Sequence, residues 1–96
     1  MKYYTKKEAK EEVSKGWSGL IDEVWKFKKR SDQITDIKEK LGGLRISTYG
    51  SAKFQDFLEE IEDKSFTICE FCGKPGTPRK KYGWIKTTCD ECHNNR

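Results

Sequence analysis

The sequence predicts an α+β protein in which N-terminal helices, a β-hairpin and an amphipathic helix pack with a C-terminal cysteine module. Apolar residues recur at helical spacing in 18–32 and again in 51–64. Between these helices, a glycine pair is flanked by apolar and charged residues in a strand-like pattern. All four cysteines lie within 69–92. We therefore expect a helical and hairpin part over 1–64 and a cysteine module over 65–96, packed as one compact unit.

The composition limits both the size of the core and the class of protein. The chain has 96 residues, 33% of them apolar, and must build its core largely from three Trp, five Phe and four Tyr. A domain this small often needs a metal or disulfides as well. No stretch approaches the roughly 20 apolar residues of a membrane helix, and no apolar signal segment is present. We expect a cytoplasmic protein without membrane contact, in which reduced cysteines can bind metal.

The N-terminal segment predicts two helices. Thr5 followed three residues later by Glu8 is a capping-box pattern, which predicts a helix over 5–15 that stops at Gly16. The second helix, over 18–32, has one apolar stripe formed by Leu20, Ile21, Val24 and Trp25. Three consecutive cations follow this stripe, as suits the C-terminal end of a helix.

Residues 34–50 predict a β-hairpin, because the Gly42-Gly43 pair suits a two-residue turn with positive φ. The expected cross-strand pairs are Leu41 with Leu44, Lys40 with Arg45, and Lys38 with Ser47. The expected apolar face consists of Ile37, Leu41, Leu44 and Ile46. The alternative is a short helix over 34–41 that ends at Gly42, followed by a single strand over 44–49.

The segment after this hairpin predicts an amphipathic helix. Ser51 is a suitable N-cap, and the apolar residues at i, i+3, i+4 and i+7 are Phe54, Phe57, Leu58 and Ile61. The outer face is acidic and consists of Asp56, Glu59, Glu60, Glu62 and Asp63. Residues 65–68 are then expected to form a short strand that leads into the cysteines.

The cysteines form two matched pairs, Cys69-x₂-Cys72 and Cys89-x₂-Cys92, separated by 16 residues. A two-residue spacing lets both sulfurs of a pair reach one ion at about 2.3 Å. This pattern predicts one Zn²⁺ with four thiolate ligands, in a zinc ribbon or a shortened treble clef. Four thiolates close the coordination shell, so the ion is expected to be structural, whereas a redox dithiol or an iron–sulfur cluster is the alternative.

Catalytic patterns are missing from the sequence, and we expect no enzymatic activity. The ending CDECHNNR is similar to the tail of HNH nucleases, but no histidine lies between the two cysteine pairs. His93 is therefore expected to be a surface residue or a hydrogen-bond donor near the metal. The chain also lacks a nucleophile–base pair and a phosphate-binding GxxxxGK[ST] loop.

Four segments occur in this order along the chain: GWSGLIDEVW, IKEKLGGLR, CEFCGKPG and GWIKTTCDECH. Together they make residues 16–93 similar to a group of small, uncharacterised bacterial and bacteriophage proteins. The resemblance implies no activity, but it implies a phage or prophage origin and a role in countering or managing the host. Within these segments we expect Trp17 to be a core residue. Trp84 is expected to cover the metal site or pack on the 51–64 helix. Thr87 is expected to bond a thiolate or the strand backbone.

Two groups of exposed residues indicate a phosphate-bearing ligand, either nucleic acid or a nucleotide. Lys38, Lys40 and Arg45 surround the glycine turn, and either a bound anion or ion pairs with the acidic helix would offset their repulsion. The second group lies between the cysteine pairs: Arg79, Lys80, Lys81, Tyr82 and Trp84. Cations there would contact phosphates and the aromatic rings would stack on bases.

Two other functions remain open on the sequence alone. The acidic outer face of 51–64 favours an inhibitor that binds a host defence or transcription protein by presenting negative charge. A subunit whose aromatic residues complete a homo-oligomer is the third possibility.

Overall fold

The computed structural model describes residues 3–94. The first two residues of the expected helical and hairpin part, 1–2, and the last two of the expected cysteine module, 95–96, lie outside the described residues. It confirms the α+β class, with helices and two small antiparallel sheets. The elements are α1 (Lys6–Glu12), the 3-10 turn η1 (Lys15–Trp17), α2 (Ser18–Phe27), β1 (Gln33–Lys40), β2 (Gly43–Tyr49), α3 (Ala52–Ser65), β3 (Thr77–Lys81), β4 (Trp84–Thr88) and α4 (Asp90–Asn94).

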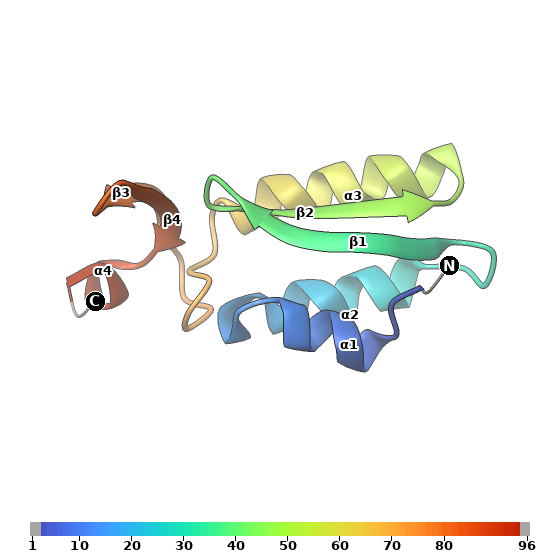
Figure 1. Cartoon of the computed structure of the whole chain (residues 1–96), viewed down its shortest axis with the longest axis horizontal. Coiled ribbons are helices and arrows are strands. Elements are labelled where there is room, and N and C mark those ends of the chain that lie inside the picture. Colours follow the sequence, from blue (N-terminus) through green and yellow to red (C-terminus); the bar gives the residue numbers. More distant parts are fainter. Residues whose placement is uncertain (1–2, 95–96) are drawn as a thin grey trace.

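The molecule is elongated, with principal extents of 42 × 22 × 22 Å. The hairpin β1–β2 runs along its length, α3 packs against β2, and α2 contacts both α1 and α3 (Figure 1). The cysteine module, with β3, β4 and α4, lies beyond the turn of this hairpin at one end of the molecule (Figure 1).

The core is formed where α2, α3 and the hairpin meet. Its members are Ala9, Trp17, Leu20, Ile21, Val24, Ile34, Ile37, Leu44, Phe54, Leu58 and Ile61. Trp17 is only 1% exposed, which confirms it as a core residue, and its Nε1 donates a hydrogen bond of 3.0 Å to the carbonyl of Ile68. The ring of Phe27 stacks on that of Phe57 at 4.1 Å and closes the contact between α2 and α3.

The N-terminal helix begins as expected but ends early. Thr5 and Glu8 form the capping box, since each side chain accepts a hydrogen bond from the other residue's backbone N–H. Helix α1 stops at Glu12, so the expected helix over 5–15 is three residues too long at its C-terminal end. Gly16 instead lies in the 3-10 turn, where its N–H donates to the carbonyl of Glu70 at 2.8 Å.

The hairpin is present, but its expected register is wrong by two residues. The turn consists of Leu41 and Gly42, with φ values of 52° and 86°, as a type I′ turn requires. The observed pairs are therefore Lys38 with Arg45, Glu39 with Leu44, and Lys40 with Gly43. Gly43 lies in the strand at a place where a Cβ would come within 2.4 Å of the Phe66 ring, so a larger residue would not fit there.

The shift by an even number of residues leaves the two faces of the hairpin as expected. Ile37 and Leu44 are buried, and Lys38, Lys40 and Arg45 are exposed. Leu41 is the exception, because it lies at the turn and is 64% exposed instead of joining the apolar face.

Helix α3 begins at the expected N-cap, where Ser51 accepts a hydrogen bond of 3.2 Å from the N–H of Phe54. It continues through Ser65, whose Oγ accepts a hydrogen bond of 2.8 Å from the N–H of Leu44 and so joins the helix end to the hairpin. The expected strand over 65–68 is wrong, since a single bridge between Ile68 and Pro75 is all the sheet pairing there.

None of the helices within 3–94 combines the length and the apolar character that a bilayer crossing demands.

Candidate metal centre

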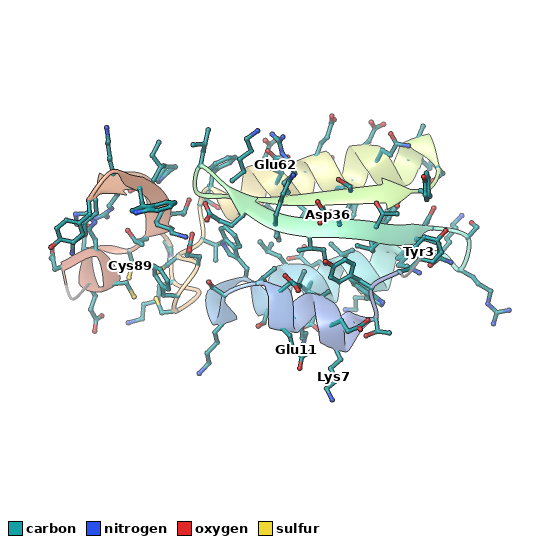
Figure 2. The ribbon with its side chains drawn as sticks, in the orientation of Figure 1. Tyr3, Lys7, Glu11, Asp36, Glu62 and Cys89 are labelled. Atoms are coloured by element: carbon teal, nitrogen blue, oxygen red, sulfur yellow. The ribbon has the colours of Figure 1, made fainter. Side chains whose placement is uncertain are left out.

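The structure brings the four cysteines together at one point of the C-terminal module. Their Sγ atoms all lie within 4.8 Å of one another, and those of Cys72 and Cys89 are 3.5 Å apart. A tetrahedral ion with sulfur ligands at about 2.3 Å needs sulfurs about 3.8 Å apart. Figure 2 labels Cys89 in this cluster, at the opposite end of the molecule from Tyr3. The spacing of the sulfurs therefore fits a single ion.

The first pair lies on a tight turn built from local backbone contacts. The N–H of Gly73 donates to the carbonyl of Cys69 at 2.9 Å, and the N–H of Cys69 donates to the carbonyl of Lys74 at 2.7 Å. Gly73 has a φ of 83°, a conformation that glycine adopts without strain. This turn aims the side chains of Cys69 and Cys72 at the same point.

The second pair lies on a strand end and a helix. Cys89 directly follows β4, and Cys92 lies on α4, where its N–H points at the Cys89 sulfur at 3.4 Å. A knuckle, a hairpin and a short helix therefore follow one another. This order corresponds to the shortened treble clef, whereas a zinc ribbon would have a second knuckle in place of α4.

The thiols are arranged so that one ionises easily and another does not. Burial by itself would raise the pKa of the Cys69 thiol. Hydrogen bonds from backbone N–H groups, of which that of Cys89 has the largest effect, outweigh burial and lower the pKa of Cys69 to about 6. The neighbouring Cys89 thiol raises the pKa of Cys92 to about 12. Several thiolates cannot accumulate in this space without a cation. A soft divalent metal supplies the missing positive charge, so the donor set fits such an ion.

The module is joined to the rest of the protein through its buried residues. Thr87 donates a hydrogen bond of 2.6 Å to the carbonyl of Gly42 in the turn of the first hairpin, and not to a thiolate or to strand backbone as expected. Lys86 reaches Glu39 of β1 at 2.8 Å and Glu70 of the knuckle at 3.4 Å. Burial raises the pKa of Glu70, which is 1% exposed.

Four of the five expected ligand-binding residues of the module line one cavity of about 220 Å³: Arg79, Lys81, Tyr82 and Trp84. Lys80 is on the other face of β3, because it pairs with Ile85 while its neighbours pair with Trp84 and Lys86. Trp84 is 72% exposed. The expectation that it packs over the metal or on α3 is therefore wrong.

The cations of the first hairpin are not part of this cavity. Lys38 and Arg45 face each other across the strands. The Arg45 guanidinium lies 3.7 Å from the carboxylate of Glu62 on α3, and the Lys38 amine lies 3.8 Å from that of Asp36. Arg45 therefore has the expected ion pair with the acidic helix, whereas the partner of Lys38 is on its own strand.

Four residues that line the cavity were missed in the sequence: Phe71, Lys86, Thr88 and His93. Two of them, Lys86 and Thr88, could have been predicted from the alternation of side chains along a strand. Trp84, Lys86 and Thr88 are spaced two apart and therefore share a face of β4. The contributions of Phe71 and His93 depend on how the knuckle and α4 fold back against the hairpin. No local pattern encodes that contact.

Comparison with models of protein families, with curated proteins and with solved structures finds no match for this chain.

Proposed function

We propose that this protein is a non-catalytic binding module whose C-terminal part folds around one structural Zn²⁺. The supporting observation is the makeup of its interior. Within 66–94 the fully buried residues are Cys69, Glu70, Thr87, Thr88 and Cys89. None of the aliphatic or aromatic side chains of this stretch is fully buried, so metal binding must supply the free energy that folds it.

Zinc is the ion that best suits this cluster. All four cysteines are free of disulfides, as zinc binding requires. Four thiolates leave no open position for water or substrate, which removes the usual route to metal-assisted catalysis. The sulfur spacing fits one ion rather than a larger iron–sulfur cluster.

The ligand that we assign to this module bears both bases and phosphates, and is single-stranded nucleic acid or a nucleotide. The observation that supports it most is two exposed aromatic rings on one hairpin, Tyr82 at 85% and Trp84 at 72% exposure. Such rings stack on any base, and each stacked base contributes about 1–3 kcal/mol. Lys80 is exposed on the other face of the same hairpin, and we expect its long side chain to reach a phosphate of the strand.

Base stacking should contribute more to the binding affinity than contacts between cations and phosphates, because several cations of the hairpin already have partners within the protein. Arg79 pairs with Asp90 at 2.5 Å, and Lys81 donates to the carbonyl of His93. We therefore expect two or three phosphate contacts and a slope of about −1 to −2 for the logarithm of affinity against the logarithm of salt concentration.

Fluorescence anisotropy with a labelled eight-nucleotide single strand tests this function. Trp84→Ala should weaken binding about 5- to 100-fold, which corresponds to the stacking of one base. Tyr49→Ala is the matched control, since Tyr49 is a 59% exposed aromatic on the other hairpin. Equal losses in the two variants, or no binding by the unmodified protein, would refute the assignment.

A second candidate function rests on α3. Asp56, Glu59, Glu60 and Asp63 are all exposed on its outer face and could dock on a basic protein surface. A host defence or transcription protein is the partner to test if the phage origin implied by the resemblance is correct. Glu59→Lys with Glu60→Lys should abolish such a complex and leave nucleic-acid binding unchanged.

A further inference from the structure

The two edges of the hairpin β1–β2 differ in what covers them. Along β1, the N–H of Tyr4 from the N-terminal segment donates to the carbonyl of Ile34 at 3.1 Å, so the chain itself occupies part of that edge. Strand β2 has β1 as its one strand neighbour within 3–94, so its other edge is open to a further strand. Helix α3 runs along β2 on the side away from β1 (Figure 1).

The hydrogen-bond pattern of the hairpin shows which backbone groups face the open edge. In an antiparallel pair, every second residue directs its N–H and carbonyl away from the partner strand. Leu44 is such a residue, because its N–H donates to Ser65 Oγ of α3 at 2.8 Å. Ile46, two residues further along β2, therefore also directs its N–H and carbonyl to the open edge. Ser65 occupies the start of this edge, and the stretch from Ile46 onward is free for a partner.

A groove of about 310 Å³ follows this stretch of β2, between the strand and α3. It is lined by residues of both elements: Ile46, Ser47 and Thr48 of β2, and Gln55, Leu58, Glu59 and Glu62 of α3. Its volume lies at the lower end of the range for ligand sites, which suits a short segment of chain. Residues 46–49 contain neither a charged residue nor a proline, the features that commonly keep an edge strand from pairing.

The groove is acidic. Glu62 (labelled in Figure 2) is paired with Arg45 at 3.7 Å, but Glu59 is exposed and has no ion pair within 3–94. Nucleic acid would be repelled here, and two copies of this chain paired edge to edge would bring their glutamates together. An extended segment with basic side chains is the occupant that complements this charge. Three further acidic residues extend the negative charge over the outer face of α3: Asp56, Glu60 and Asp63.

We propose that the open edge of β2 binds an extended, basic segment of a partner protein, which adds a third strand to the hairpin and directs a lysine or arginine to Glu59. The N–H and carbonyl of Ile46 exchange hydrogen bonds with the backbone of that segment and supply affinity, whereas Glu59 selects the basic side chain. This inference rests on the second candidate function, docking through the acidic face of α3, and deepens it by naming the binding mode. It is independent of nucleic-acid binding by the C-terminal module.

The probe is a nine-residue peptide in which valine and lysine alternate, titrated into the nitrogen-15-labelled, zinc-loaded full chain. The backbone amide resonances of Ile46 and Thr48 should shift as the peptide binds. The same peptide with its backbone amides N-methylated keeps its charge but cannot pair as a strand. It should bind at least about 5-fold more weakly, which corresponds to the loss of two hydrogen bonds.

A pair of variants tests the charge. Glu59→Gln should weaken binding of the unmodified peptide about 2- to 5-fold, as expected for one exposed ion pair. Glu60→Gln is the matched control and should leave binding unchanged, because Glu60 is exposed on the same helix but does not line the groove. Equal losses in the two variants would overturn the assignment of the basic side chain to Glu59.

The outcomes separate this inference from the function on which it rests. Equal binding of the two peptides, or no binding with unshifted Ile46 and Thr48 amides, would overturn strand addition at β2. The second candidate function would still stand if Glu59→Lys with Glu60→Lys abolished a complex with a host protein, because α3 would then dock without a paired strand. Loss of strand addition together with an unaffected host complex would overturn both.

Discussion

Two glycines three residues apart, Gly16 and Gly19, differ completely in what surrounds them. A Cβ on Gly16 would lie 2.1 Å from the carbonyl oxygen of Cys69, whereas nothing lies within 4 Å of a Cβ on Gly19. The atom that Gly16 approaches is backbone of the knuckle and cannot rotate away. Gly16 therefore permits the contact between the 3-10 turn and the cysteine module.

We expect Gly16→Ala to destabilise the protein by about 1–3 kcal/mol, as overpacking does in a tight contact, and to weaken metal retention. Gly19→Ala, in an exposed helical position, should instead stabilise it by about 0.5–1 kcal/mol. Urea denaturation of the two variants, with zinc release followed by a chromogenic chelator, measures both quantities. A Gly16→Ala protein as stable as the Gly19→Ala protein would show that this contact does not form.

At the scale of the elements, side-chain periodicity predicted most of what the structure contains. The apolar stripe of Phe54, Leu58 and Ile61 correctly predicted which face of α3 is buried. The alternation of apolar and polar residues around Ile37 correctly predicted the buried face of the hairpin. Register was not encoded in the same way, because a shift of two residues leaves the faces unchanged. The close approach of Gly43 to the Phe66 ring belongs to the observed register, and it cannot be inferred without the tertiary fold.

The observed register places Leu41 in a conformation that leucine seldom adopts, with a φ of 52°. Since this side chain is 64% exposed, little packing is lost on replacement. Leu41→Asn should therefore raise the free energy of unfolding by about 1 kcal/mol, because asparagine tolerates the left-handed region. Chemical denaturation measures the change. A clear loss of stability would favour the register in which Leu41 pairs across the strands.

At the scale of the whole molecule, a helical body with an apolar core is joined to a module that has none. The joint includes backbone and charged contacts, namely Gly16 with Glu70, Thr87 with Gly42, and Lys86 with Glu39. It also includes Ile68, which packs against the core and accepts the hydrogen bond of Trp17. The cysteine spacing in the sequence predicted the cluster. It could not predict α4 or the cavity, because both depend on how the module folds around its centre.

Native mass spectrometry of protein purified under reducing conditions, without added metal, tests the central claim most directly. The spectrum should show one zinc ion per chain, and stripping it with a chelator should unfold 66–94 while the residues around Trp17 and Phe54 keep their protection from hydrogen exchange. A chain with no bound metal whose C-terminal module is nevertheless folded, or cysteines joined as disulfides, would contradict it.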